Sequence, residues 1–371
     1  MESRGHEVEF WTAEKFFYRV ISPFKIKKWL GYIDQFLIFP LQVKIRLRKY
    51  TPETLFVFAD QALGPWVPLV KKRPHVVHCH DFMALKSAIG LIDEHPVSWT
   101  GKIYQNLIRK GFMQGQNFIS VSKKTQQDLL KFIPNKQESS QVVYNQVAPL
   151  FKRKNKLSAR SRLANYIGKT KGLRPNLSKG FILHVGIDVW YKNKRGVLEL
   201  YVEWRKITQK DFPLVMVGKP GKNLTPFIEQ SNLNGNLIVL ENIPQEILVD
   251  AYCGASVFIF PSLEEGFGWP IAEAMACGCP VITTKLAPMT EVGGNAAYYI
   301  DRQTPKRTDL NSWEQNGAKV IEGVLNLKPN DLEKVIQAGI KNVKKFQGTA
   351  IVDQTEAFYK RTLENNLINF K

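Results

Sequence analysis

The later half of the chain alternates short apolar runs with segments of helical spacing. The apolar runs are rich in β-branched residues and bounded by glycine, proline or polar residues; they cover 180–186, 213–219, 236–242, 256–262 and 280–284. Between them, apolar residues recur at helical spacing over 196–207, 224–232, 244–255 and 269–278. Strands that alternate with helices in this way predict a parallel sheet covered on both faces. We therefore expect a doubly wound, Rossmann-like α/β domain over residues 181–345.

The first half repeats this alternation less regularly. Its candidate strands are 6–12, 54–59, 75–80, 117–122 and 141–145. They predict a second α/β domain of the same kind over residues 1–150. Doubly wound domains usually open with a strand, a glycine-rich turn and a helix. The chain begins with ESRGHEVEFW, which has the pattern of a helix end running into a second strand, so we expect this domain to lack its first strand–helix unit.

Two further segments lie outside these domains. Residues 151–180 carry ten Lys and Arg and no Asp or Glu, and their charge and Gly, Pro and Ser content predict an exposed basic linker between the domains. Residues 346–371 contain a helical pattern beyond the second sheet. We expect a C-terminal helix there, and the N-terminal domain is one candidate for its packing partner.

The amino-acid composition of the chain indicates which kinds of protein it can and cannot be. The 371 residues are 44% hydrophobic and 23% charged, which suits two globular domains and excludes wholesale disorder and collagen-like repeats. Against 33 Asp and Glu there are 52 Lys and Arg, a net charge of +19 that favours an anionic partner. The four cysteines form no CxxC pair and indicate a reducing compartment. With no apolar run of about 18 residues and no signal-peptide pattern, we expect a cytoplasmic protein, with a peripheral place on the inner membrane face left open.

The densest chemical signal is FPSLEEGFGWPIAEAMACGCPVITT, residues 260–284. A buried strand ends at Pro261, and a GFG turn leads into a helix, an arrangement that lets backbone N–H groups approach a phosphate. Seven residues separate Glu265 from Glu273, and this spacing can place both carboxylates in one crevice at the carboxyl end of the sheet. There they could accept hydrogen bonds from a ribose or a hexose. Taken singly, each could also be an ordinary loop or helix acid.

As a whole, this stretch resembles the signature of the retaining GT-B glycosyltransferases of family 4. In that family two glutamates bracket a GFG turn; the first faces the transferred sugar and the second holds the nucleotide ribose, which maps onto Glu265 and Glu273. Further segments are similar to the family's strands and turns, namely 4–12, 76–82, 142–147, 184–193, 215–221 and 243–262. The resemblance implies two Rossmann-like domains that face each other across a cleft.

The resemblance also implies roles for individual residues. The implied catalytic residues are Glu265, His80 and Lys192, and the implied acceptor-side residues are His80 and Asp81. The implied donor-binding residues are Gly186, Lys192, Arg195, Gly218, Ile243, Glu265, Gly266, Phe267, Gly268 and Glu273. The family often has Arg after the glycine that aligns with Gly186, but this chain has Ile187. The cationic role therefore falls on Lys192, with Lys194 or Arg195. We interpret His78 as a structural strand residue, and Ser122 and Lys123 more as loop residues than as cleft residues.

The resemblance implies that a sugar moves from a nucleotide-diphosphate-sugar to a hydroxyl with retention of anomeric configuration. No Asp-x-Asp triplet occurs, which fits a site without a metal and without a cofactor beyond the nucleotide-sugar substrate. The departing diphosphate would be stabilised by Lys192 and the turn at 266–270. Two alternatives stay open: a non-catalytic homologue that binds a partner, and a GT-B sugar-nucleotide epimerase.

Residues 15–49 carry nine Lys and Arg, one acid (Asp34) and eight interleaved aromatic rings. Rings and cations together suit an anionic membrane surface. The same rings could instead pack the core of the first domain. Nucleic acid is a weaker candidate, because no established nucleic-acid-binding motif accompanies the charge. On the membrane interpretation, the acceptor is a lipid-linked sugar or a growing surface polysaccharide.

Overall fold

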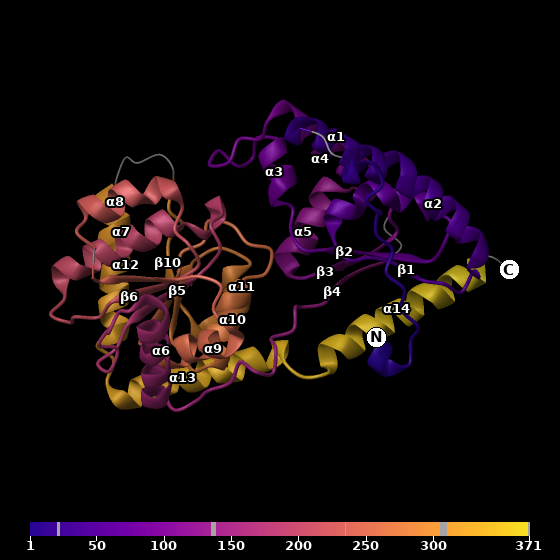
Figure 1. Ribbon diagram of the computed structural model, residues 1–371. Helices are drawn as coiled ribbons and strands as arrows, with labels where there is room; N and C mark the ends of the chain where they lie inside the picture. The colour runs from indigo at the N-terminus through magenta and orange to yellow at the C-terminus, as the bar shows by residue number, and fades with distance from the viewer. Residues whose placement is uncertain (21–22, 135–138, 234, 305–309, 370–371) are drawn as a thin grey trace.

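The computed structural model describes residues 1–20, 23–134, 139–233, 235–304 and 310–369, and it has two lobes (Figure 1). Each lobe is built on a parallel sheet with helices against it, one sheet of four strands and one of six. The predicted α/β fold with two Rossmann-like sheets is therefore confirmed.

The C-terminal sheet has the strand order β10-β9-β8-β5-β6-β7, with every neighbouring pair parallel. Its strands are β5 (Ile182–Val185), β6 (Leu214–Val217), β7 (Leu237–Leu240), β8 (Val257–Phe260), β9 (Val281–Thr284) and β10 (Tyr298–Ile300). The first five lie within the predicted strand segments, whereas β10 was not predicted. The order reverses between β5 and β8, and in such sheets ligands bind in the crevice outside the carboxyl ends at this reversal.

Helices cover both faces of this sheet. They are α6 (Lys156–Lys171), α7 (Lys194–Ile207), α8 (Thr225–Gln230), α9 (Gln245–Gly254), α10 (Trp269–Ala276), α11 (Met289–Gly293), α12 (Leu310–Leu325) and α13 (Pro329–Val343). Successive strand residues point to opposite faces. Leu183 and Phe258 pack with α6, α9 and α10, while Ile182 and Val257 pack with α7 and α12. The lobe is doubly wound, as predicted.

The segment predicted to be an exposed linker is largely a helix of the C-terminal lobe. Ala159, Leu163 and Ile167, spaced four residues apart on α6, are fully buried in the core that also contains α9. Arg160 of the same helix donates hydrogen bonds to the carbonyl oxygens of Gly254 (2.8 Å) and Ser178 (2.7 Å). The prediction of exposure was wrong because the charge of this segment lies on one side of a helix whose other side is apolar.

The N-terminal sheet runs in one direction, β1-β2-β3-β4, and all its pairs are parallel. Its strands are β1 (Phe56–Phe58), β2 (His75–Cys79), β3 (Asn117–Ser120) and β4 (Ser139–Val142). The connecting helices are η5 (Gln61–Leu69), α3 (Met83–Ala88), α4 (Trp99–Phe112) and α5 (Lys123–Phe132). Right-handed crossovers that all step the same way place these helices on one face, where Val67, Phe112 and Leu129 pack against Val77 and Phe118.

The strand predicted over residues 6–12 does not form. This segment is irregular and pairs with no strand. It is held by side chains instead: Glu9 accepts a hydrogen bond from the hydroxyl of Tyr50, and the Trp11 ring lies edge-on to Tyr50 (5.3 Å) and Phe56 (5.6 Å). Its alternating pattern therefore reflects packing on the edge of the lobe rather than membership of the sheet.

The last helix, α14 (Ala350–Asn369), covers the second face of the N-terminal sheet (Figure 1). Ile351 and Phe358 pack there against Val76 and Ile119. The ring Nε2 of His78 lies 2.7 Å from the Tyr359 hydroxyl, and burial lowers the pKa of His78 to about 4. A neutral, hydrogen-bonded ring on this face confirms that His78 is structural.

Before β1, the chain forms α1 (Phe24–Ile33), a π-helical turn η3 (Asp34–Ile38) and α2 (Phe39–Arg46) on the outside of the N-terminal lobe (Figure 1). Part of this segment packs inward: the Phe36 ring stacks on Trp66 at 6.0 Å, and Trp66 Nε1 donates to the Gln35 carbonyl at 3.1 Å. Other rings, such as that of Trp29, stay exposed. Of the helices in the described residues, none is both long and apolar enough to span a bilayer.

Candidate functional site

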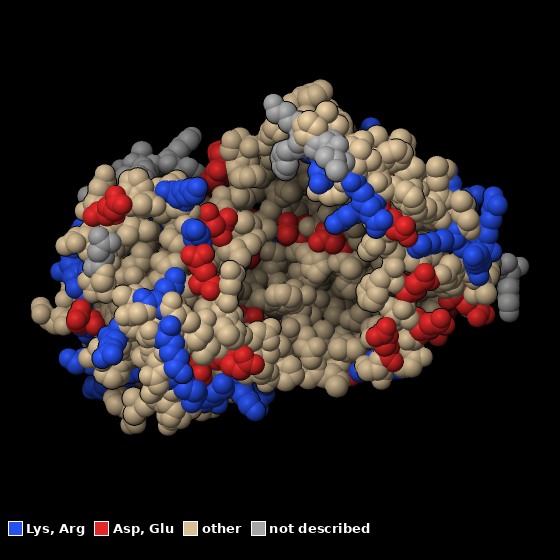
Figure 2. Space-filling view, in the orientation of Figure 1, with Lys and Arg blue, Asp and Glu red and all other residues tan. Residues whose placement is uncertain are grey.

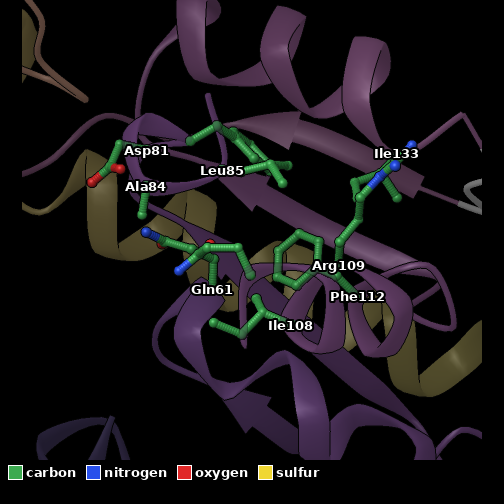
Figure 3. A pocket seen from close by; sticks show the side chains of 10 residues that line it. Gln61, Asp81, Ala84, Leu85, Ile108, Arg109, Phe112 and Ile133 are labelled. Atoms are coloured by element: carbon green, nitrogen blue, oxygen red, sulfur yellow. The ribbon is translucent and has the colours of Figure 1, made fainter. Parts of the chain in front are cut away.

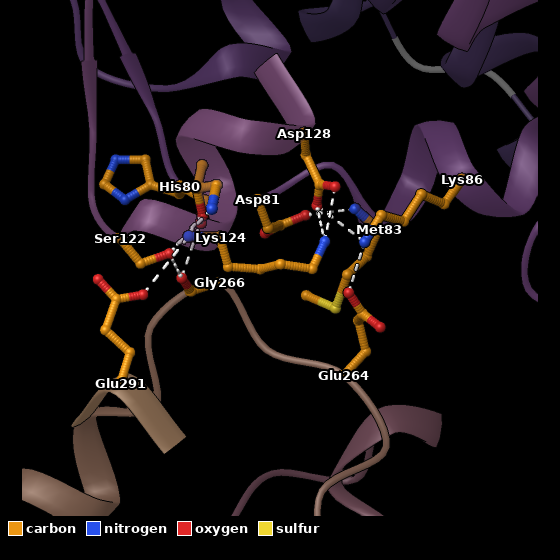
Figure 4. Close-up of polar contacts among 11 residues, drawn as sticks. His80, Asp81, Met83, Lys86, Ser122, Lys124, Asp128, Glu264, Gly266 and Glu291 are labelled. Atoms are coloured by element: carbon orange, nitrogen blue, oxygen red, sulfur yellow. Dashed lines mark hydrogen bonds and ion pairs between the residues drawn. The ribbon is translucent and has the colours of Figure 1, made fainter. Parts of the chain in front are cut away.

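A loop of the C-terminal lobe touches the N-terminal lobe at Gly266, between β8 and α10 (Figure 4). A Cβ atom at this position would lie 1.9 Å from the carbonyl oxygen of His80, so no larger residue fits without moving the lobes apart. The Gly266 carbonyl accepts hydrogen bonds from Ser122 Oγ (2.8 Å) and Thr125 Oγ1 (3.1 Å). Gly266 therefore joins the lobes, and this close contact is sufficient to explain why residue 266 is a glycine.

Charged groups join the lobes on either side of Gly266 (Figure 4). Lys86 Nζ lies 2.6 Å from Glu264 Oε1 of the other lobe and 2.8 Å from Asp128 Oδ2 of its own. Glu291 accepts a hydrogen bond from the Lys123 amide at the start of α5, at 2.8 Å. Ser122 and Lys123 are thus contact residues between the lobes. Around these contacts the surface is hollowed between the lobes, and acidic side chains lie in the hollow (Figure 2).

Lys192 and Glu265 form a buried ion pair at the carboxyl edge of the C-terminal sheet. Lys192 ends the short helix η6 (Trp190–Lys192) that follows β5, and Glu265 lies in the loop after β8. Lys192 Nζ is 2.7 Å from Glu265 Oε1 and 4.7 Å from the ring centroid of Phe260. Burial raises the pKa of Glu265, and the charge of Lys192 opposes this shift. Because β5 and β8 flank the reversal of strand order, the pair lies at the expected ligand crevice.

Glu273 reaches the same region from α10. Its Oε2 accepts a hydrogen bond from the hydroxyl of Tyr252 on α9, at 3.0 Å. Burial raises the pKa of Glu273, while the Tyr252 hydrogen bond and the charge of Lys192 lower it. The structure therefore brings together Lys192, Glu265 and Glu273, as the sequence predicted, and adds Tyr252, which the sequence analysis missed.

Across the crevice, Asp81 rather than the His80 ring faces Glu265. Burial raises the pKa of Asp81, and the negative charge of Asp81 in turn contributes to the raised pKa of Glu265. Its Oδ1 accepts a hydrogen bond from the Met83 amide at 2.9 Å, which fixes the carboxyl at the start of α3. The ring Nε2 of His80 lies 2.8 Å from the Ala59 carbonyl, at the end of β1. The catalytic role of His80 and the acceptor-side role of Asp81 stay predictions.

Beside Asp81, a pocket enters the N-terminal lobe between η5, α3 and α4 (Figure 3). Its walls are largely apolar, with Leu85, Ile108 and Phe112 among them, and Gln61 supplies a polar group. Asp81 and Arg109 also line this pocket, so it has charged groups as well as apolar walls.

Part of this chain matches a known protein family. Residues 169–308, which include Lys192, Glu265 and Glu273, match the family model described as Glycosyl transferases group 1. The C-terminal lobe of this chain is therefore similar to the group 1 glycosyltransferases over residues 169–308. The resemblance drawn from the sequence is thereby confirmed.

Two curated proteins that are similar to this chain are named as mannosyltransferases. O-antigen chain mannosyltransferase B of Escherichia coli is 31% identical over 186 residues, which cover 49% of this chain and 46% of that protein. O-antigen chain mannosyltransferase RfbU of Salmonella typhimurium is 24% identical over 263 residues, 70% of this chain and 66% of that protein. The chain therefore spans less than two thirds of the length of either relative.

Among solved structures, sucrose-phosphate synthase from Thermosynechococcus elongatus superposes with a TM-score of 0.67 at 18% identity. The match covers 90% of this chain and 79% of that one. At this identity the likeness shows the fold alone, and it supports the two-lobed GT-B architecture.

The predicted donor cation Arg195 is engaged elsewhere. Its Nε lies 2.6 Å from Glu199 Oε1, one turn along α7, and its guanidinium is 3.7 Å from the ring centroid of Phe227 on α8. These contacts hold the Arg195 head group against α8. Arg195 is therefore a poor candidate for contacting the diphosphate.

The neighbouring Lys194 is directed toward the predicted glycine turns. It is buried, its Nζ donates to the Lys219 carbonyl, and burial lowers the pKa of Lys194. Gly186 and Gly218 also meet here: Gly218 has φ +104°, and a Cβ on it would lie 2.0 Å from the Gly186 carbonyl and 3.4 Å from Lys194 Nζ. Of the two cations named from the sequence, Lys194 lies at this turn. Ile187, where the family often has Arg, is exposed.

The remaining predicted donor residues support the loop. The buried Phe267 ring lies 5.2 Å from that of Phe346 and 6.2 Å from that of Tyr144, and so anchors the loop between the lobes. Gly268 has φ +98° and precedes α10. Ile243 is half-buried on the core of the C-terminal lobe. The side chain of Phe267 therefore packs away from the crevice, and only its backbone is available to a donor.

Lys194 and Tyr252 carried weak signals in the sequence. Tyr252 lies inside the segment 243–262 that resembled the family, but its partner Glu273 is 21 residues away on another helix. Lys194 follows Lys192 by two residues, and only the start of α7 decides which cation turns inward. Within the described residues, no group of three or more His, Cys, Asp or Glu could hold a metal ion. A reaction without a metal stays a prediction.

Proposed function

We propose that this chain transfers mannose from a nucleotide-diphosphate-mannose to a hydroxyl of a growing O-antigen-type polysaccharide, with retention of anomeric configuration. The arrangement that carries the proposal is the buried pair of Lys192 and Glu265, with Glu273 beside it and Asp81 across the crevice. The identity of the sugar and the acceptor class rest on the two relatives named O-antigen chain mannosyltransferases.

The C-terminal lobe binds the donor. Lys192 and Lys194 are buried cations at adjacent turns, and together they neutralise the diphosphate. Tyr252 occupies Oε2 of Glu273, which leaves Oε1 to accept a hydrogen bond from a ribose hydroxyl. Positive charge placed where the leaving group gains negative charge stabilises the transition state more than the ground state.

The chemistry is a single displacement at the anomeric carbon. The bond between that carbon and the β-phosphate oxygen breaks, and its electron pair leaves with the diphosphate. The acceptor hydroxyl attacks from the same face, and its proton passes to the departing phosphate oxygen, so the configuration is retained. Glu265 orients the mannose and stabilises its developing positive charge, and Asp81 orients the acceptor hydroxyl. The lysines supply the positive charge toward the diphosphate, so we propose that the reaction needs no metal.

The test is a transfer assay with the purified chain. Nucleotide-mannose and nucleotide-glucose donors are supplied with a lipid-linked O-antigen oligosaccharide in the presence of EDTA, and the product is analysed by mass spectrometry and NMR. We expect mannose transfer with retention, lost in Glu265→Gln and kept in Glu229→Gln, a matched change at an exposed glutamate on α8. Transfer of another sugar, inversion, or dependence on a metal would contradict the corresponding part of the proposal.

The same assay separates the two alternatives. A non-catalytic homologue would bind a nucleotide-sugar, seen as a thermal shift, but would transfer nothing to any acceptor. An epimerase would convert the donor into its epimer without an acceptor. Either result would replace the proposed transfer.

A further inference from the structure

One stretch on the outside of the N-terminal lobe exposes a stripe of large apolar side chains. We call residues 26–49 the basic arm; they include most of α1, all of η3 and α2, and the turn that follows. Trp29 (64% exposed), Leu37 (60%), Leu41 (57%) and Ile45 (61%) are spaced by eight, four and four residues. Residues four apart are neighbours on one face of a helix, so Leu37, Leu41 and Ile45 follow one another along the arm. Trp29 is exposed on the preceding helix α1. The opposite face is buried against the lobe, as shown by Val43.

The exposed side of the basic arm carries positive charge without an exposed acid. The arm contains the cations Lys27, Lys28, Lys44, Arg46, Arg48 and Lys49. Its one acid, Asp34, is buried and accepts hydrogen bonds from the amides of Phe17 and Tyr18, both at 2.9 Å. The Asp34 carboxylate is therefore bonded inside the fold. Glu14, which precedes the arm, lies 3.9 Å from Arg46, and the other cations of the arm give its exposed side an excess of positive charge.

Helix α4 adds a second stripe next to the basic arm. Trp99 (75% exposed), Ile103 (51%) and Leu107 (42%) recur every four residues along it. The Phe36 ring of the arm lies 6.3 Å from that of Tyr104, so the two helical segments pack side by side. Such a concentration of exposed apolar side chains is unusual for a protein surface that meets only water.

From these observations we infer that the basic arm and α4 dock on the surface of an anionic lipid bilayer. Apolar side chains such as Trp29 and Leu41 enter the boundary between head groups and acyl chains, while Lys44, Arg48 and Lys49 contact anionic head groups. Amphipathic helices with rings and aliphatic side chains on one side and Lys or Arg beside them bind membranes in this way. The inference rests on residues outside the crevice and is independent of the proposed transfer.

The charge and the apolar side chains of this surface disfavour two other binding partners, a second copy of the chain and nucleic acid. A second copy of the chain seated on the stripe would bring two surfaces with an excess of positive charge together, which repel each other. Nucleic acid would match the cations but would leave Leu37, Leu41 and Ile45 against phosphates and water, with no gain from their burial. An anionic bilayer offers negative charge and an apolar layer at the same surface.

The test is flotation of the purified full chain with vesicles of phosphatidylcholine alone or with anionic phosphatidylglycerol. We expect binding to the anionic vesicles that weakens with salt. Lys44→Gln/Arg48→Gln/Lys49→Gln should lower the partition coefficient about a hundredfold, at about fivefold for each cation. Leu41→Gln/Ile45→Gln should also weaken binding, because it shortens the apolar stripe.

Matched controls lie on α6, which is also basic. Leu157 is 67% exposed there, and Leu157→Gln should leave flotation unchanged, as should Lys169→Gln/Lys171→Gln. Thermal melts confirm that each variant folds, and nucleotide binding measured without vesicles should be the same in all of them. Failure of transfer with intact flotation would reject only the proposed function.

Four outcomes would overturn the inference. Equal binding to neutral and anionic vesicles would show that the cations do not contribute to binding. Unchanged binding of the arm variants would show that the basic arm does not contact the bilayer. Dimerisation in light scattering that Leu41→Gln/Ile45→Gln abolishes would assign the stripe to a second copy. Binding to an RNA or DNA duplex that competes with vesicles and depends on Lys44, Arg48 and Lys49 would assign it to nucleic acid.

Discussion

Each lobe contains a parallel sheet whose two faces are covered by helices, and the source of these helices differs between the lobes. In the C-terminal lobe the strand order reverses between β5 and β8, so its own crossover helices fall on both faces. In the N-terminal lobe the order runs in one direction, and the connecting helices all fall on one face. The other face is covered by α14, from the far end of the chain. The N-terminal lobe therefore depends on a distant segment, and the C-terminal lobe does not.

The largest expected effect is on the packing of α14. Phe358 is fully buried against the N-terminal sheet, and Phe358→Ala should lower the free energy of unfolding by about 3–5 kcal/mol. Hydrogen exchange should quicken in β1–β4 and stay slow in β5–β10. Phe181→Ala, a matched change in the core of the C-terminal lobe, should show the reverse. Equal quickening in both sheets after Phe358→Ala would mean that the lobes are not separate in stability.

Acid should weaken the same contact. Burial lowers the pKa of His78 from 6.5 to about 4, so between these values the unfolded chain binds a proton that the folded chain excludes. Stability is therefore lost as the pH falls through this window, by up to about 3 kcal/mol at its lower end. His78→Gln should make the loss shallower in thermal melts from pH 7 to pH 4. His184, whose pKa burial lowers to about 3, acts in the same direction in the C-terminal lobe and should leave a residual slope. An unchanged slope in the variant would show that His78 does not titrate with unfolding.

The difference between the lobes extends to ligands, because the donor is proposed to bind the C-terminal lobe. Lys194→Ala should raise the KM for the nucleotide-sugar and lower kcat/KM about a hundredfold, with little change in the KM for the acceptor. Arg195→Ala, one residue along the same helix, should change kcat/KM much less because its head group contacts Glu199 and Phe227. The opposite ranking of these two variants would restore Arg195 as the donor cation.

The smallest effect concerns the orientation of Glu273. Tyr252→Phe removes one hydrogen bond to that carboxylate and should weaken nucleotide binding by about 1.5 kcal/mol, roughly tenfold. It should leave the acceptor KM unchanged. Isothermal titration with the free nucleotide gives the value directly, and Tyr298→Phe, in the same lobe but without this contact, is the control. Equal nucleotide affinity in the two variants would show that Tyr252 packs in the core and does not orient Glu273 for nucleotide binding.

The strands were predictable wherever the local pattern alone decides them. Runs such as 75–80 and 256–262 are apolar and β-branched over lengths that suit buried strands, and β2 and β8 form there. The segment 6–12 has a similar alternation but meets no partner strand, and pairing is a tertiary property. Residues 151–180 were predicted to be an exposed linker because of their high charge, and the four-residue spacing of Ala159, Leu163 and Ile167, which forms the buried face of α6, was missed.

The site was predictable to the extent that it lies within one lobe. Lys192, Glu265 and Glu273 are all in the C-terminal lobe, and the motif that contains two of them was legible in the sequence. Asp81 faces Glu265 only because Gly266 lets the two lobes touch, and 184 residues separate the two acids in the chain. The resemblance to a family implied an acceptor-side role for Asp81, but the residues themselves gave no sign that its carboxyl lies near Glu265.

The most direct measurement is the rate of mannosyl transfer by Lys192→Ala. We expect this lysine, at the carboxyl edge of the C-terminal sheet, to stabilise the departing diphosphate. We predict a fall of about 10²–10³ in kcat, in addition to the loss of stability that follows from removing one partner of a buried ion pair, and full activity in Lys334→Ala, a change at an exposed lysine on α13. A kcat for Lys192→Ala equal to that of the unmutated chain would contradict this expectation.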